Sequence, residues 1–201
     1  DLELAGACLD EHPEVRYAVT VNLYGHALDR VALRSLKERH GLKLVEDCAQ
    51  SIGAQSRGQA AGGVGQLATF SFYPTKNLGA LGDGGALVTD DELLAERCRR
   101  LRDYGQRGRY EHVELGLNSR LDELHAAILR SAFLPRLDDW TRARRRIATR
   151  YTSEITRLTP LPTPPGSDSV WHLFPVATRE GERESALAAL RAAGVQANVH
   201  Y

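Results

Sequence analysis

The sequence predicts an α/β fold with a mainly parallel sheet, and two observations support this prediction. The first is a strand, a helix and a strand in succession: residues 16–24 (RYAVTVNLY) and 42–48 (LKLVEDC) are rich in strand-forming residues, and residues 30–40 carry apolar side chains at helical spacing. This order forms a βαβ unit, whose strands are parallel. The second is another apolar run, residues 68–73, which Pro74 ends because proline cannot donate to a sheet.

Local patterns predict the remaining elements of the first 158 residues. Asp29 is placed to cap the helix of the βαβ unit, and Gly41 is placed to end it. Periodicity predicts helices over residues 2–11, from Asp90 or Asp91 to about residue 104, over residues 119–131 and over residues 134–158. A further strand is predicted over residues 86–89. Loops are predicted over residues 50–66 and 105–116.

A proline-rich segment, residues 159–167 (TPLPTPPGS), predicts a boundary near the end of the chain. Residues 170–178 and 195–200 after it have the composition of strands, and residues 182–193 have apolar side chains at helical spacing. We therefore expect these residues to open a second, smaller α/β domain.

Composition excludes several classes of protein. Lys+Arg and Asp+Glu both number 26 among 201 residues, so the zero formal charge does not call for nucleic acid or an anionic membrane as partner. The RARRR cluster at residues 142–146 is interpreted as a solvated helix face. No apolar run approaches the roughly 20 residues that are needed to span a bilayer. Cys8, Cys48 and Cys98 lack CxxC spacing, which predicts neither disulfides nor a metal site and indicates the cytoplasm.

Both ends of the sequence suggest a piece of a longer protein. The chain contains no methionine, and its first residues show no basic and apolar leader. Residues 195–201 stop inside a predicted strand. We therefore expect further sequence on both sides.

Residues 67–85 (LATFSFYPTKNLGALGDGG) carry the strongest chemical signal. Lys76 follows the end of the predicted strand, and four glycines follow within nine residues, which predicts unusual backbone angles and close approach to a ligand. A lysine in this place is either a reactive amine or an ordinary solvated loop residue, and the local pattern allows both. The glycine run matches neither the GxxxxGK[ST] nor the GxGxxG phosphate-binding pattern.

Four polar residues, Asp47, Gln50, Ser71 and Lys76, fall at or near the carboxyl ends of predicted parallel strands. Ligands of open α/β sheets bind at this edge. An acid, an amide, a hydroxyl and a lysine suit pyridoxal 5′-phosphate (PLP), which needs a lysine for its Schiff base and an acid opposite its pyridine nitrogen. Ordinary roles remain open: Asp47 could cap a turn, Ser71 could be a satisfied core hydroxyl, and Gln50 alone carries little signal.

Three separated motifs closely resemble the DegT/DnrJ/EryC1/StrS family of sugar aminotransferases. They are VEDCAQSIGA at residues 45–54, FSFYPTKNLGALGDGGALVT at residues 70–89 and GLNSRLDELHAAIL at residues 116–129, and VNLYG at residues 21–25 is also similar to the family. The resemblance covers essentially the whole chain, with the motifs in the family's order. It implies a fold-type I PLP-dependent transferase, like aspartate aminotransferase.

The resemblance also implies two domains and a role for each site residue. Residues 1–135 would be part of the PLP-binding large domain, and residues 136–201 a linking helix with part of the small domain. By position in the motifs, Lys76 would form the Schiff base with PLP and Asp47 would pair with the pyridinium nitrogen.

Three further positions are assigned in the same way. Gln50 would contact the cofactor ring or its hydroxyl side, and Ser71 would bind its phosphate. Asn118 would reach the phosphate of the cofactor in a neighbouring subunit. The resemblance thus implies a homodimer with shared active sites.

The activity implied is amino-sugar biosynthesis by transamination. An amino acid, expected to be glutamate, would donate an amino group to a keto group of a nucleotide-linked deoxysugar, and Lys76 would move the proton. Residues 101–110 (LRDYGQRGRY) resemble members that act on 3-keto sugars. The alternatives are a sugar dehydratase of the same family, in which histidine typically replaces the lysine, and a non-catalytic regulatory module; a nucleotide-binding protein is a more distant alternative.

Two positions depart from the family's pattern, and one expected segment is missing. His125 stands where glutamine is common and is interpreted as a helix-surface change, whereas Asn22 stands where histidine is common and is expected to alter substrate contacts. The family's N-terminal segment, whose helix N-terminus also holds the phosphate, is absent. We therefore expect this piece to be impaired by itself.

Overall fold

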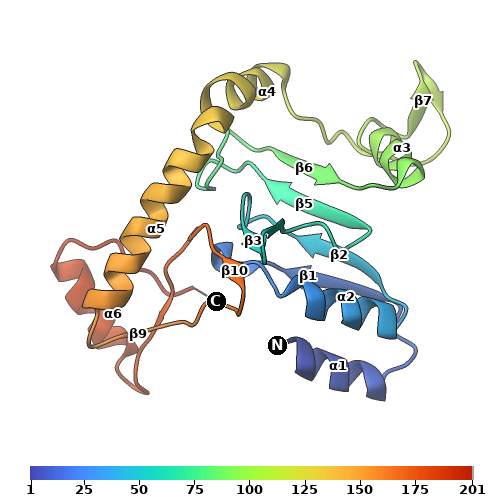
Figure 1. Cartoon of the computed structure of the whole chain (residues 1–201). Helices are drawn as coiled ribbons and strands as arrows, with labels where there is room; N and C mark the ends of the chain where they lie inside the picture. The colour runs from blue at the N-terminus through green and yellow to red at the C-terminus, as the bar shows by residue number, and fades with distance from the viewer. Residues whose placement is uncertain (201) are drawn as a thin grey trace.

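The computed structural model describes residues 1–200 (Figure 1). The α-helices are α1 (Leu2–Glu11), α2 (Arg30–Arg39), α3 (Glu92–Leu101), α4 (Glu123–Ile128), α5 (Leu137–Glu154) and α6 (Arg183–Ala192). The strands are β1 (Tyr17–Val21), β2 (Lys43–Asp47), β3 (Gln55–Ser56), β4 (Gln59–Ala60), β5 (Leu67–Ser71), β6 (Gly85–Val88), β7 (Gln106–Gly108), β8 (Glu111–His112), β9 (Thr159–Pro160), β10 (Ser167–Asp168) and β11 (Val176–Ala177). Short helical turns are η1 (Leu23–Gly25), η2 (Leu129–Phe133) and η3 (Leu134–Arg136).

The main sheet has the strand order β1-β2-β5-β6. Strands β1, β2 and β5 are parallel, which confirms the predicted βαβ unit, and β6 runs antiparallel to β5. Across the three parallel strands Val21, Asp47 and Thr69 stand side by side. The carboxyl ends of these strands therefore form one edge of the sheet, which faces α5 in Figure 1.

Helix α2 forms where the sequence predicts it, because both of its ends are specified locally. The Asp29 carboxylate accepts hydrogen bonds from the backbone N–H groups of Val31 and Ala32 at 2.8 and 3.1 Å, which satisfies two of the helix's unpaired donors. Beyond its other end, Gly41 takes φ 61°, a conformation that favours glycine. Leu33 then packs with Leu44 of β2, so the helix covers one face of the sheet.

A buried carboxylate fixes the loop that leads from β2 to β5. Glu46 is only 2% exposed, and its two oxygens accept hydrogen bonds from the backbone N–H groups of Gly62, Val64 and Gly65 at 2.6–3.0 Å. These donors lie in buried or partly buried positions and would otherwise lose their partner, so the side chain stabilises the loop from inside. Nothing in the local sequence pattern singled out Glu46.

The predicted strands after the proline-rich segment are largely wrong. Among the described residues, 195–200 contain no strand, and pairing within residues 170–178 is limited to β11, opposite β9. The preceding segment instead turns back onto the first part of the chain: β10 pairs with β3, and Val170 donates to the carbonyl of Gly25 at 2.9 Å. Val170 is fully buried against Ala27 and Ala54, so this apolar run serves packing rather than a new sheet.

The predicted helix over residues 119–131 begins later than expected and is irregular. Asp122 caps α4, and the chain continues through the π-helical turn η2 and the 3-10 turn η3 into α5. Leu129 and Leu137 on these turns and helices pack with Leu78 and Ala80, which places α5 against the loop after β5. In the described part of the chain, every helix is too short or too polar to cross a lipid bilayer.

Candidate active site

Asp47 and Ser71 end two adjacent parallel strands and lie at the same edge of the sheet. Asp47 is the last residue of β2, and Ser71 is the last residue of β5. The backbone N–H of Cys48 donates to the carbonyl of Thr69 at 2.8 Å, so the two strands stay paired up to this edge. The acid and the hydroxyl therefore come together as parallel strands require.

Asp47 both caps a turn and offers a second oxygen. Its Oδ1 accepts a hydrogen bond from the backbone N–H of Ala49 at 2.9 Å, which is the ordinary capping role considered for a strand-end acid. Within residues 1–200, Oδ2 has no hydrogen-bond partner, and the side chain is half-buried. One carboxylate oxygen is thus available to a cationic group of a ligand.

Gln50 links the ends of β1 and β2. Its Oε1 accepts a hydrogen bond from the backbone N–H of Tyr24 at 2.7 Å. Tyr24 has φ 59° in the turn η1, a conformation that costs free energy for a non-glycine residue unless its surroundings hold it. Gln50 therefore helps to hold the η1 turn beside the edge where Asp47 lies.

Lys76 sits on a tight turn just past β5. Its backbone N–H donates to the carbonyl of Tyr73 at 2.8 Å, and Ala80 donates to the carbonyl of Phe72 at 2.7 Å, which folds the turn back on the strand. The side chain is half-buried, and its amine forms no ion pair with any residue from 1 to 200. A half-buried amine without an ion pair is suited to covalent chemistry.

The glycine run after Lys76 serves packing rather than unusual backbone angles. Within it no glycine has a positive φ, which corrects the conformational expectation. A Cβ added to Gly79 would lie 2.5 Å from the carbonyl oxygen of Pro74, and one added to Gly85 would lie 2.7 Å from that of Phe70. The close approach that requires glycine is therefore to the chain's own backbone.

The two departures from the family pattern both contact other parts of the chain. A Cβ on Gly82 would lie 3.2 Å from the His125 ring, and His125 is half-buried, so it is not a helix-surface change. Asn22 is 1% exposed; its Oδ1 accepts from the backbone N–H of Leu28 at 2.9 Å, and its Nδ2 donates to Cys48 Sγ at 3.3 Å. Asn22 thus braces the β1–α2 loop from inside, contrary to the expected substrate contact.

Cys48 stays protonated beside the site. Burial raises the pKa of its thiol to about 11. Since the thiolate is the reactive form, this cysteine does not act as a nucleophile at neutral pH.

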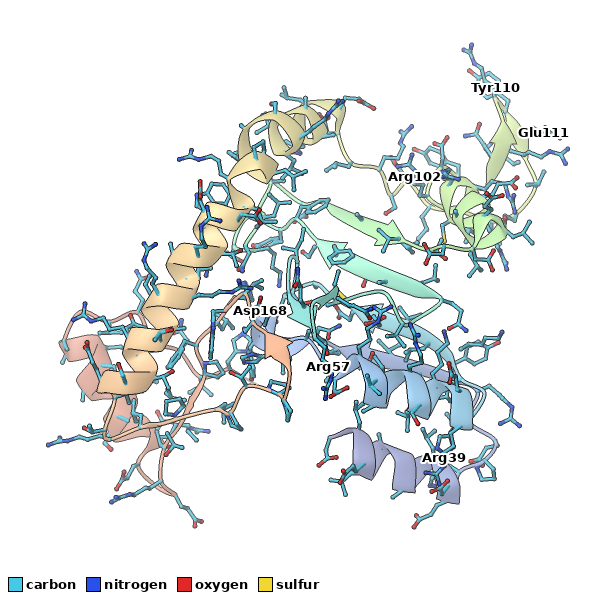
Figure 2. The ribbon with its side chains drawn as sticks, viewed as in Figure 1. Arg39, Arg57, Arg102, Tyr110, Glu111 and Asp168 are labelled. Carbon is cyan, nitrogen blue, oxygen red and sulfur yellow. The ribbon has the colours of Figure 1, made fainter. Side chains whose placement is uncertain are left out.

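Asn118 lies apart from the other predicted site residues. It is exposed and pairs in an isolated bridge with Asp103, which follows α3, and its Oδ1 accepts from Arg120 Nε at 3.1 Å. The neighbouring Ser119 N–H donates to the carbonyl of Arg102 at 2.9 Å, and Figure 2 shows Arg102 beside α3, at the end toward which β6 runs. Because β6 is antiparallel to β5, this is the edge opposite the turn of Lys76.

Two residues near Lys76 were not predicted from the sequence. Asn77 is 6% exposed, and its side-chain Nδ2 donates to the carbonyl of Val170 at 2.9 Å. The Asn77 Oδ1 lies 3.2 Å from His172 Nδ1. Burial and the positive charges of Lys76 and Arg144 lower the pKa of His172 to about 4, with a smaller contribution from His200. The sequence offered one signal for this pair: Asn77 is a polar residue that directly follows Lys76.

These side chains fit PLP by their chemistry. Asp47 offers a carboxylate oxygen for a protonated ring nitrogen, Lys76 offers an amine without an ion pair, and Ser71 offers a hydroxyl proton for a phosphate oxygen. The Ser71 Oγ accepts from the backbone N–H of Tyr73 at 3.2 Å, which leaves its proton free to donate.

Comparison with known proteins agrees with this geometry. The model of the DegT/DnrJ/EryC1/StrS aminotransferase family matches residues 12–201. The chain belongs to this family. The fold-type I assignment follows, because solved members of the DegT/DnrJ/EryC1/StrS family superpose on the described chain throughout.

Two relatives and one solved structure illustrate the similarity. A dTDP-3-amino-3,4,6-trideoxy-α-D-glucose transaminase from Streptomyces venezuelae is 48% identical over 192 residues, which are 94% of this chain and 50% of the relative. A pleiotropic regulatory protein from Geobacillus stearothermophilus is 44% identical over 186 residues, 91% of this chain and 50% of that protein. The crystal structure of S. venezuelae DesV with a ketimine intermediate gives a TM-score of 0.91 at 46% identity, covering 100% of this chain and 54% of DesV. The chain thus spans about half the length of its curated relatives.

Proposed function

We propose that the protein is a PLP-dependent aminotransferase that acts on nucleotide-linked sugars. The observation that carries the proposal is the meeting of Asp47, Ser71 and the Lys76 turn at one edge of the sheet. Each of these residues has one group that no other residue from 1 to 200 engages: a carboxylate oxygen, a hydroxyl proton and an amine.

Each side chain has a distinct task in this proposal. PLP supplies an electron sink for the amino-bearing carbon when it is bound. Asp47 Oδ2 would keep a proton on the ring nitrogen, Ser71 would donate to the phosphate, and Gln50 would contact the ring side while it holds the η1 turn. Lys76 would hold the cofactor covalently, and its free amine would accept and return the proton of the amino-bearing carbon.

The proposed substrates are a nucleotide-linked keto deoxysugar and an amino acid, for which we propose glutamate. The S. venezuelae relative, named as a transaminase of a dTDP-3-amino sugar, supports a keto group at position 3. The product would be an amino sugar for biosynthesis. We place this activity in the cytoplasm.

A second copy of the chain is proposed to complete each site. Asn118 pairs with Asp103 after α3, apart from the Lys76 turn of its own chain, and Leu115 and Leu117 beside it are 98% and 74% exposed. Apolar side chains this exposed are typical of a surface that a partner covers. In a homodimer Asn118 would reach the neighbouring cofactor's phosphate.

We also propose the division into a large-domain part, residues 1–135, and a linking helix with a small-domain part, residues 136–201. Support comes from α5, which leads away from the sheet after residue 136. Strand β10 then returns to pair with β3, so the two parts stay in contact.

Two alternative functions are less well supported. A dehydratase of the same family would carry histidine in place of Lys76, so the lysine favours transamination. A non-catalytic regulator is suggested by the name of the Geobacillus stearothermophilus relative. The intact set of Asp47, Ser71 and Lys76 argues against a role without the cofactor.

Trapping of PLP on a single lysine tests the proposal. The chain holds three lysines, so the expected result is one borohydride-reduced adduct on Lys76 when the full-length protein is mixed with PLP, read by peptide mass spectrometry. Lys43→Ala changes an exposed lysine at the other end of β2 and is the matched control, which should keep the adduct. No adduct, or an adduct confined to Lys43 or Lys37, would contradict the proposed function.

A further inference from the structure

His172 and Asn77 form a side-chain pair next to the lysine turn. Asn77 directly follows Lys76, whereas His172 comes from the segment after β10, which lies beside β3 in Figure 1. The two residues are 95 positions apart, and Asn77 Oδ1 lies 3.2 Å from His172 Nδ1. The pair therefore ties a distant part of the chain to the residue beside the reactive amine.

The hydrogen bonds determine where the proton of the His172 ring lies. The carbonyl of Val170 can only accept, so the Asn77 amide turns its Nδ2 toward it, at 2.9 Å. The Asn77 Oδ1 consequently faces His172, and because it too can only accept, Nδ1 of the ring must carry the proton. Nε2 is left as the acceptor of the ring.

The surroundings of His172 are positively charged. Arg144 Nη1 donates to the backbone carbonyls of Trp171 and His172 at 3.2 and 3.4 Å. Partial burial, followed by the positive charges of Lys76, Arg144 and His200, lowers the pKa of His172 well below neutral. The imidazole is therefore uncharged at neutral pH.

We propose that His172 is a positioning residue for Lys76: its ring, held through Nδ1 by Asn77, fastens residues 170–172 to the turn that carries the amine. An amine that moves protons must be held in one place. A fixed turn limits the conformations that the Lys76 side chain can take. This inference rests on the proposed function of Lys76.

A measurement on the protein without PLP tests the geometry directly. In the full-length protein with ¹⁵N-labelled histidine, NMR should show the Nδ1–H tautomer of His172 and a neutral ring between about pH 5 and 8. Lys76→Gln removes a positive charge that lowers the pKa of His172 and should therefore raise that pKa, whereas Lys43→Gln, which changes a remote exposed lysine, should not. An Nε2–H tautomer, or an unchanged pKa in Lys76→Gln, would overturn the proposal.

Kinetics of the loaded enzyme tests the positioning role. His172→Phe should lower kcat by roughly 10- to 100-fold with little change in KM, because it removes the hydrogen bond to Asn77 that fixes the lysine turn. His172→Gln, which can still donate to Asn77, should recover much of this loss, and His12→Gln at the exposed N-terminal region should change nothing. Wild-type kcat in His172→Phe, or no recovery in His172→Gln, would refute it.

The two proposals can fail separately. If borohydride traps no PLP on Lys76, the aminotransferase assignment fails, and the positioning role fails with it whatever the tautomer of His172. If Lys76 is trapped but the ring carries its proton on Nε2, only the role of His172 is refuted.

Discussion

Replacement of Asp47 by asparagine is expected to lower kcat by roughly 10²- to 10³-fold while PLP still attaches to Lys76. The carboxylate Oδ2 has no hydrogen-bond partner among residues 1–200, so its charge is available to hold a proton on the cofactor ring. Asparagine keeps Oδ1, which caps Ala49, but it loses the negative charge. Borohydride trapping and steady-state kinetics on the same sample separate cofactor attachment from turnover.

Asp47→Ala tests how much the hydrogen bond between Asp47 Oδ1 and the backbone N–H of Ala49 stabilises the fold. It removes both the charge and the hydrogen bond to Ala49, so it should match Asp47→Asn in kcat and lose roughly 1 kcal/mol more in unfolding free energy. Near-normal turnover in Asp47→Asn would show that another acid serves the ring nitrogen. A large loss of stability in Asp47→Asn would indicate that the charge serves the fold instead.

Replacement of Glu46 by alanine is expected to lower the free energy of unfolding by about 3–5 kcal/mol. The carboxylate is 2% exposed and accepts from the three backbone donors of the β2–β5 loop, at Gly62, Val64 and Gly65. Without it, three N–H groups in buried or partly buried positions lose their partner. Urea denaturation followed by circular dichroism measures the change.

Glu46→Gln separates charge from shape. Glutamine keeps one oxygen for Val64 and Gly65 but turns an amide toward the N–H of Gly62, so we expect a loss of about 1–3 kcal/mol. Glu11→Ala, at the exposed end of α1, should stay within about 0.5 kcal/mol. Equal stabilities of Glu46→Ala and Glu11→Ala would show that the loop finds other acceptors.

The elements predicted correctly are those with local signals at both ends. Helix α2 has a capping Asp29 and a terminal Gly41, and α1 and α6 have regular apolar spacing. The parallel pairing of β1 and β2 followed from the helix between them, because a strand–helix–strand unit has one favoured handedness. The strands expected near the C-terminus were wrong because Val170 is buried against Ala27 and Ala54, a destination that no local pattern encodes.

The candidate site, like the fold, could be predicted only in part from the sequence. Asp47 and Ser71 come together at the edge because they end neighbouring parallel strands, which sequence spacing implies. Their assigned roles, and those of Gln50, Lys76 and Asn118, came from the family motifs and remain predictions. The motifs carried no information on how Asn22 is packed, and its burial follows from contacts with Leu28 and Cys48.

The sequence by itself determined the family, the βαβ core and the place of Lys76 just after β5. These features depend on periodicity, capping residues and contiguous motifs, all of which act over a few neighbouring residues. Only the tertiary structure decided that Glu46 holds a loop and that His172 pairs with Asn77, the residue after Lys76. The Asn77 amide reaches Val170 and His172 across 93 and 95 positions, and burial selects such pairs after the chain has folded back on itself.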